Sequence, residues 1–148
     1  MSDFTIKHAS SDRDMPFLLD KVSSINRRKG YVLQLFDPSA VRGKMHLVAS
    51  YLNAIASFRD GRNNSKSVSM EMLLYVSFTR QIGEAISIAG AKTNNDFIIF
   101  SNSKKAYSMI SRYLVVSQEI KVERIALGSK NGPVNASMMQ DIAISGLK

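Results

Sequence analysis

Short apolar runs of strand length alternate along this chain with stretches in which apolar residues recur every three or four positions. Alternating or unbroken apolar runs suit strands, whereas three- and four-residue spacing suits one face of a helix. We therefore expect an α/β or α+β protein with a mixed central sheet of about four strands, flanked by helices. The runs that predict strands are residues 4–8, 31–36, 97–100 and 142–147.

Five stretches have helical spacing, at residues 15–28, 39–58, 70–78, 80–89 and 103–114. Asp37 and Pro38 are expected to start the second of these helices, Ser69 to cap the third and Ser103 the fifth. The strand at 31–36 is rich in apolar residues, which favours a central place in the sheet. Residues 117–127 fit a short helix or a strand equally well. Two buried stripes are expected: Val41, Met45, Val48, Leu52 and Ile55 in the second helix, and Ile82, Ala85, Ile86 and Ala89 in the fourth.

The chain has 148 residues and no interdomain linker, which predicts one domain spanning residues 1–148. It has no cysteine, so disulfides, cysteine-based zinc sites and thiol nucleophiles are excluded. No apolar run approaches the roughly 20 residues that cross a bilayer. The polar N-terminus does not have the pattern of a signal peptide. We therefore expect a cytoplasmic protein that does not associate with a membrane.

The positive charge is concentrated in one part of the chain. Residues 21–66 hold nine lysines and arginines against two carboxylates, whereas the other residues hold eleven cations and ten anions. Such a basic segment is typical of a protein with an anionic partner, first nucleic acid and second an anionic membrane. The alternative is a solvated surface that only keeps the protein soluble.

The motifs that would indicate catalysis are missing. The sequence has no phosphate-binding loop of the Walker type, no dinucleotide-binding glycine motif and no nucleophile elbow. His8 and His46 are the only histidines, they are not spaced as a pair of metal ligands, and we expect His46 on a helix surface. We therefore expect no catalytic residue, no metal site and no cofactor. The pattern favours a binding or adaptor protein over an enzyme.

A more specific signal lies between Arg62 and Lys92, where the chain reads RNNSKSVSMEMLLYVSFTRQIGEAISIAGAK. This stretch resembles the small regulatory subunit of the KEOPS complex, the PRPK-binding-protein (TPRKB) family, in its archaeal form. In that family a polar loop precedes an apolar helix that contains a glutamate, and an R-Q-I element follows. Phe78 stands where the family usually has glycine, so we expect a less sharply turned junction here. The matching residues are Asn63, Lys66, Glu71, Leu73, Leu74, Ser77, Arg80, Gln81, Ile82, Ala85, Ile86, Gly90 and Lys92.

The resemblance implies a role in tRNA modification. KEOPS makes threonylcarbamoyladenosine in the anticodon loop of tRNA, with one catalytic subunit and a kinase/ATPase subunit of the PRPK family. The small subunit is not catalytic. It binds the kinase/ATPase subunit, and through it joins the catalytic subunit. It also binds tRNA, chiefly at the single-stranded 3′ CCA end. The α/β fold of that family agrees with the fold expected from the pattern.

The expected tRNA-binding residues supply cations and hydrogen-bonding groups that suit phosphates and unstacked bases. Four of them lie in one polar loop, namely Arg62, Asn63, Lys66 and Ser67. Arg80 and Gln81 lie between two helices, where they bind RNA or, alternatively, tie the junction together through Glu71. Basic residues would extend the contact along the tRNA body, and these are Arg59, Lys44 and Arg28.

The kinase contact is expected to be apolar, since aliphatic and methionine side chains anchor permanent interfaces. The candidates are Met138, Met139, Ile142 and Ile144, and the alternative is that they are ordinary core residues. Two other functions stay open. One is a kinase regulator that binds protein and makes no RNA contact. The other is a small basic RNA-processing enzyme that uses His8 or His46.

Overall fold

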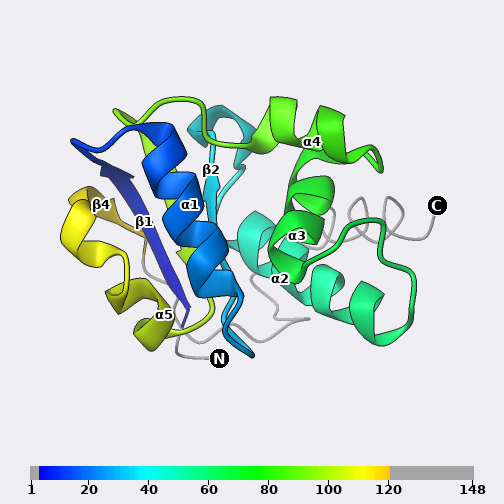
Figure 1. Cartoon of the computed structure of the whole chain (residues 1–148). Coiled ribbons are helices and arrows are strands. Elements are labelled where there is room, and N and C mark those ends of the chain that lie inside the picture. The colour runs from blue at the N-terminus through cyan, green and yellow to red at the C-terminus, as the bar shows by residue number, and fades with distance from the viewer. Residues whose placement is uncertain (1–3, 121–148) are drawn as a thin grey trace, which may run out of the picture. The chain divides into compact units, whose positions relative to one another are not determined.

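The computed structural model describes residues 4–120 (Figure 1). These residues fall into two compact units. Unit 1 consists of residues 4–38 and 90–120, and unit 2 of residues 39–89. The expectation of one domain over the whole chain stays a prediction. The expected strand at 142–147 lies outside the described residues, as do the four expected kinase-contact residues, Met138, Met139, Ile142 and Ile144.

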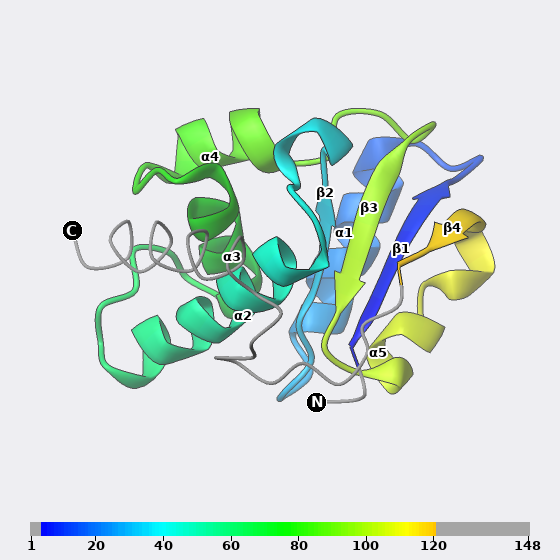
Figure 2. The same cartoon turned by 180° about the vertical axis from the view of Figure 1, so that it is seen from behind.

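Unit 1 contains a four-stranded sheet in the order β2-β3-β1-β4, which Figure 2 shows from behind. The described sheet has the expected number of strands, and the class is α+β. Three strands match the expected runs, whereas the fourth, at residues 115–119, overlaps the stretch at 117–127 that fits a helix or a strand equally well. All three strand pairings are antiparallel, whereas a mixed sheet was expected. Hydropathy reports which faces of a strand are covered and carries no information on strand direction. The strands are β1 (Thr5–Ser10), β2 (Leu33–Phe36), β3 (Phe97–Ser101) and β4 (Val115–Glu119).

The prediction that the strand at 31–36 is central was wrong. Every residue of β2 is buried, but β2 pairs only with β3 and forms one end of the described strand order. An unbroken apolar run reports that both faces are covered, and it does not report how many neighbours the strand has. The inner positions belong to β3 and β1, and β3 is also buried throughout.

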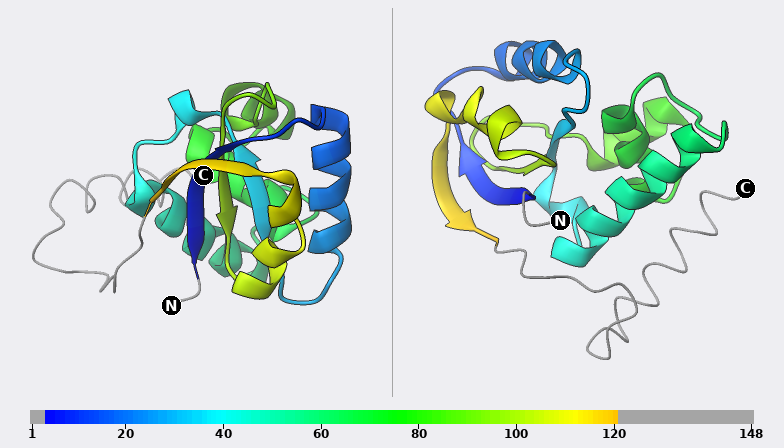
Figure 3. Two further views of the ribbon diagram at one scale, coloured as in Figure 1. Left: turned by 90° about the vertical axis from the view of Figure 1, so that its left-hand side faces the viewer. Right: turned by 90° about the horizontal axis from the view of Figure 1, so that it is seen from below.

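Two helices of unit 1 lie on the same face of the sheet (Figure 3). Helix α1 (Met15–Asn26) begins at Asp14, whose Oδ1 accepts the N–H of Phe17 at 3.0 Å. Helix α5 (Lys104–Ser108) is capped by Ser103, as expected, but it ends early and a short 3-10 helix, Ser111–Tyr113, follows. The core between helices and sheet contains Ala9, Leu18, Val22, Ile25, Leu33, Leu35, Phe97, Ile99, Ala106 and Ile110.

Unit 2 is helical: α3 (Val68–Ser77) packs against both α2 (Lys44–Arg59) and α4 (Ile82–Ala89). The expected start of α2 at Asp37 and Pro38 was wrong. Pro38–Ala40 form only a 3-10 turn, and α2 begins after Gly43, whose φ of +137° suits glycine alone. In unit 1, the Asp37 carboxylate forms an ion pair with the Lys92 ammonium, at a distance of 2.8 Å.

Burial in unit 2 also differs from the expected stripes. His46, expected on a helix surface, is completely buried in the first turn of α2, whereas Ile55 is 37% exposed. In α4 only Ala85 and Ala89 are buried, and Ile86 is 46% exposed. These two small residues let α4 lie against α3, so the larger isoleucine at position 86 is left on the outside.

Within residues 4–120, no helix has the length and apolar character needed to cross a membrane.

Candidate nucleic-acid interface

The polar loop between α2 and α3 is held in place by one buried carboxylate. Glu71 is only 1% exposed, although it lies among the apolar residues of α3. Its oxygens accept the backbone N–H of Asn64 at 3.0 and 3.1 Å and the hydroxyl of Ser65 at 2.7 Å. A buried carboxylate needs such donors, because leaving it unpaired costs several kcal/mol. Glu71 therefore fixes the path of the loop that carries the expected RNA contacts.

Two of the expected tRNA-binding side chains also hold the loop. The Oγ of Ser67 accepts the N–H of Met70 at 3.1 Å, so Ser67 caps α3, where Ser69 had been expected to do so. The side-chain amide of Asn63 donates to the carbonyl of Ser65 at 2.9 Å. Lys66 is exposed beside them, and no ion pair among the described residues involves its ammonium group. The loop therefore presents Lys66 from a fixed backbone.

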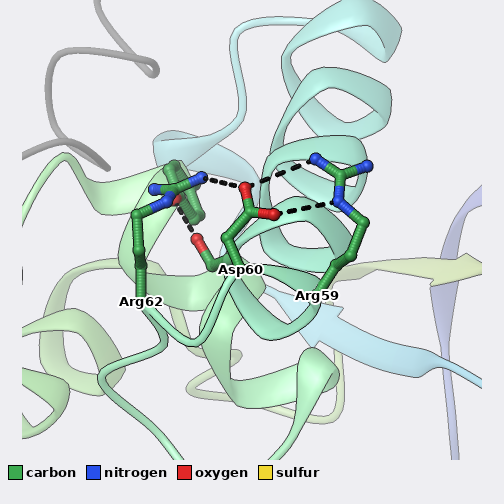
Figure 4. A network of polar contacts seen from close by, with 5 residues as sticks. Arg59, Asp60 and Arg62 are labelled. Carbon is green, nitrogen blue, oxygen red and sulfur yellow. Dashed lines mark hydrogen bonds and ion pairs between the residues drawn. The ribbon is translucent and has the colours of Figure 1, made fainter.

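Arg59 and Arg62 share a single carboxylate. Asp60 lies between them, 3.1 Å from Nε of Arg59 and 3.4 Å from a terminal nitrogen of Arg62 (Figure 4). The hydrogen bond from Arg59 is the largest cause that lowers the pKa of the Asp60 carboxyl, and Arg62 adds to it. Asp60 therefore stays ionised and neutralises part of the positive charge expected here. Because Arg59 and Asp60 are exposed and Arg62 is only half-buried, a phosphate can replace the carboxylate at little cost.

Arg80 and Gln81 are exposed between α3 and α4. Glu71, given as an example of a partner that would let them tie the junction together, binds the loop instead. Thr79 holds the junction instead: its Oγ1 donates to Glu84 at 2.6 Å and accepts the N–H of Gln81 at 3.2 Å. Neither Arg80 nor the Gln81 side chain is needed for these contacts.

The junction between α3 and α4 is sharply turned, contrary to expectation. Phe78 ends α3 in the left-handed conformation, with φ of +59° and ψ of +34°, and it is the only non-glycine residue with positive φ among residues 4–120. Its backbone therefore adopts the conformation that glycine favours at the end of a helix. The ring stacks on His46, with centroids 5.4 Å apart and an interplanar angle of 13°, and the Arg42 guanidinium lies 4.6 Å from its centroid.

His46 is neutral in this setting. Its pKa is lowered to about 4, first by burial and then by the nearby positive charge of Arg42, while the carbonyl of Val76 partly opposes both. Its Nδ1 accepts the N–H of Arg42 at 3.0 Å, which requires an unprotonated nitrogen there. Its Nε2 is buried and makes no hydrogen bond of normal geometry to the part of the chain that is described. A neutral, buried ring of this kind contributes packing to the Phe78 contact.

The structure brings most of the expected tRNA-binding residues into unit 2, on α2, the loop after it and the α3–α4 junction. Lys44 is the first residue of α2 and is half-buried. Arg28 belongs to unit 1, beyond the end of α1, so it does not join the others within one unit.

The two histidines proposed for the enzyme alternative lie in different units, His8 in unit 1 and His46 in unit 2. His46 is buried, and Nε2 of His8 contacts Asp96 across an exposed strand end. Among the described residues no three histidine, aspartate or glutamate side chains gather as metal ligands would.

Three residues important to this region were missed from sequence. Asp60 and Arg42 enter the sequence analysis only as charges of the basic segment, and Glu71 only as a match to the family and a partner for Arg80 and Gln81. For Glu71 a signal was present, because apolar residues flank it on both sides in the helix. No sequence signal shows that Arg42 would meet Phe78, since the contact joins the start of α2 to the end of α3.

Comparison with known proteins identifies the family. The model of the family described as kinase binding protein CGI-121 matches residues 13–142. The chain belongs to this family. Among its relatives is the KEOPS complex subunit Cgi121 of Pyrococcus abyssi (strain GE5 / Orsay), which is 36% identical over 62 residues. That match covers 40% of the chain and 36% of the relative, so it spans little more than a third of the archaeal protein. The resemblance seen between Arg62 and Lys92 is thereby confirmed as membership of the CGI-121 family.

Proposed function

We propose that this CGI-121 family member is a non-catalytic KEOPS subunit that binds the kinase/ATPase subunit and recruits tRNA through its 3′ CCA end. It would contact the catalytic subunit only through the kinase/ATPase subunit, and it would work in the cytoplasm. The family match supports the kinase-binding half, and the printed name of the Pyrococcus relative supports the assignment to KEOPS. The RNA-binding half rests on the geometry of unit 2.

The observation that carries the RNA proposal is a polar loop anchored by Glu71, which presents Lys66 beside the Arg59–Asp60–Arg62 cluster. A single-stranded RNA end offers phosphates to such cations and unstacked bases to polar side chains. Because the loop is already ordered by its own hydrogen bonds, little conformational entropy is lost when it binds. Arg80 and Gln81 extend the same set of groups at the α3–α4 junction.

The tRNA test compares intact tRNA with tRNA that lacks the CCA end, in a gel-shift assay of the whole protein. Lys66→Ala and Arg62→Ala are expected to weaken binding by about 0.5–2 kcal/mol and to reduce its dependence on salt. Lys104→Ala removes an exposed lysine from α5 in unit 1, and it is the matched control that should change little. Equal weak binding of both tRNA forms would refute capture of the CCA end. An unchanged salt dependence in the variant that carries both Lys66→Ala and Arg62→Ala would refute the loop as the phosphate-binding site.

For the kinase we propose a contact through the exposed isoleucines of α4. Ile86 is 46% exposed and Ile88 is exposed beside it, on a helix whose only charged residue is Glu84. Exposed aliphatic side chains are what a stable protein interface covers. The kinase contact expected from the sequence stays a prediction, because its four residues lie outside the described part of the chain. They are Met138, Met139, Ile142 and Ile144.

Ile86→Asp is expected to weaken capture of the PRPK-family kinase of the same source by tenfold or more, because it places a charge in an apolar contact. Leu19→Asp is the matched control, since Leu19 on α1 has the same 46% exposure. Isothermal titration with the purified kinase measures both. An Ile86→Asp variant that binds as tightly as the wild type would exclude α4 from the kinase interface.

The same assays decide between this proposal and its alternatives. Kinase binding with no measurable tRNA binding would favour a regulator that contacts protein alone. Cleavage of RNA on long incubation, lost when His8 and His46 are both replaced by alanine, would favour the enzyme.

A further inference from the structure

One aromatic ring in unit 2 has a buried neighbour and an exposed one. The half-buried ring of Phe78 stacks on the buried imidazole of His46 and also contacts the exposed guanidinium of Arg42. The three residues come from two elements, the start of α2 and the end of α3. Each is also fixed through its backbone or ring: the Arg42 N–H donates to His46 Nδ1, and the N–H of Phe78 donates to the Tyr75 carbonyl at 3.4 Å.

The backbone of Phe78 shows that this ring is held in place by its surroundings. A bulky residue in the left-handed region is strained, and it persists only where the structure around it determines the conformation. Here the contacts of the ring with His46 and Arg42 supply that constraint. The ring is therefore a rigid surface, unlike an aromatic side chain on a free loop.

The guanidinium of Arg42 differs from those of Arg59 and Arg62. Both of those share Asp60, whereas no carboxylate in the described chain forms an ion pair with Arg42. Because His46 is neutral near pH 7, it adds no like charge that would push the guanidinium away. Arg42 therefore presents a full positive charge to solvent beside an aromatic surface.

This pairing suits an unpaired nucleotide. A nucleobase stacks on an aromatic ring or on the plane of a guanidinium, and the same guanidinium attracts the adjoining phosphate. The neighbouring groups match, since Arg80 and Gln81 follow Phe78 by two and three residues and are both exposed. A protein partner would instead place a carboxylate opposite Arg42. It would offer no base edges for Arg80 and Gln81 to contact.

We propose that Arg42 and Phe78 form a stacking site for one unpaired nucleobase of single-stranded RNA. This inference rests on the proposed tRNA-binding function and adds to it a site that recognises the base itself. The loop at 61–67 binds phosphate charge, whereas the Arg42–Phe78 site provides the stacking surface.

The test uses the full chain and a single-stranded RNA oligonucleotide that ends in CCA, with 2-aminopurine in place of the terminal adenosine. Stacking of this fluorescent base quenches its emission, so the signal at saturating protein reports stacking separately from affinity. The wild type is expected to quench the probe. Phe78→Asn removes the ring but tolerates the left-handed backbone, and Arg42→Lys keeps the charge but loses the planar group. Both are expected to lose most of the quenching and about five- to tenfold in affinity.

Two controls separate stacking from the other contributions. Phe78→Tyr keeps an aromatic ring and is expected to quench like the wild type. Lys66→Ala is expected to bind more weakly, yet to quench fully once the probe is saturated. Urea unfolding of each variant shows whether it is folded, and if Phe78→Asn is not, the Arg42→Lys result alone decides.

Quenching by Phe78→Asn and Arg42→Lys equal to that of the wild type would overturn the inference while leaving the tRNA-binding proposal intact. Loss of kinase binding by these variants with RNA binding unchanged would also overturn it, and would assign the site to a protein partner. If the wild type binds neither tRNA nor the oligonucleotide, the tRNA-binding proposal fails and this inference fails with it.

Discussion

The ring of His46 is buried between the first turn of α2 and the end of α3, so protonation must place a charge where water is excluded. Its pKa in the folded protein is about 4, against 6.5 for the free side chain. Below pH 6.5 the unfolded chain therefore takes up a proton that the folded chain does not. Stability is lost as the pH falls, over the window from 6.5 to about 4.

We predict that the free energy of unfolding falls by about 2 kcal/mol between pH 7 and pH 5 because of His46 alone. His46→Gln is expected to remove this part of the pH dependence, and His8→Gln is the control that should retain it. Urea unfolding at several pH values measures the effect. The same loss of stability in His46→Gln as in the wild type would contradict the assignment.

A second prediction concerns Asp60, which neutralises Arg59 and Arg62. Asp60→Asn removes the carboxylate that a phosphate would otherwise displace, so tRNA binding is expected to tighten by about two- to fivefold and to depend more steeply on salt. Asp20→Asn, an exposed carboxylate on α1 in unit 1, is the control. If both substitutions change binding equally, only the net charge of the protein matters and the Arg59–Asp60–Arg62 cluster is not an RNA contact.

Among the elements, the loop between α2 and α3 depends on Glu71 more than on its own sequence. Replacing Glu71 by glutamine would direct an amide N–H₂ at the donors of Asn64 and Ser65. Leaving a buried donor without an acceptor costs about 1–3 kcal/mol. We predict a loss of that size in the free energy of unfolding, together with weaker tRNA binding as the loop loses its fixed path. Glu119→Gln, an exposed carboxyl on β4 in unit 1, is the control, and equal losses in both variants would contradict the role of Glu71.

Three strands and both helices of unit 1 could be predicted, because their hydropathy periods are clear and Ser103 has the residue type of a helix cap. The extent of α5 and the strand β4 could not, since the apolar spacing there fits a longer helix. The pairing of the strands could not, since contacts between β1 and β3 join residues 88 to 96 positions apart and only the folded chain selects them. In unit 2 the start of α2 was missed because Gly43, and not Pro38, determines where the helix begins. The exposure of Ile86 was missed because an eight-residue helix that packs through two alanines needs no larger buried side chain.

The candidate site was predictable only in part. Its exposed cations lie in a polar loop that the sequence shows plainly, and Lys66 is presented as expected. The groups that position or neutralise them were missed, because hydropathy does not distinguish a buried glutamate that anchors a loop from a solvated one. The contact of Arg42 with Phe78 depends on the left-handed turn at Phe78, and a bulky aromatic residue gives no indication of that conformation.

For the whole molecule, the net charge of +8 overstates what an RNA ligand would meet. In unit 2, Asp60 offsets only one of the two charges of Arg59 and Arg62, which leaves one positive charge there besides those of Arg42, Lys44, Lys66 and Arg80. Each phosphate neutralised by one cation contributes about −0.7 to the slope of log K against log salt for single-stranded RNA. With five such charges we predict a slope of about −3.5 for the CCA oligonucleotide, measured by fluorescence between low and physiological salt. A slope near −6 would mean that cations of both units take part.

The left-handed turn at Phe78 also has a consequence for how sequences of this family diverge. Glycine at this position adopts the turn whatever surrounds it, so the residues at 42 and 46 are free to drift. Phenylalanine adopts the turn only with the support of the side chains at 42 and 46, so a lineage that acquires it becomes dependent on those two residues. Family members with an aromatic residue at position 78 should therefore keep a flat side chain at 46 and a cation at 42, whereas members with glycine should vary at both.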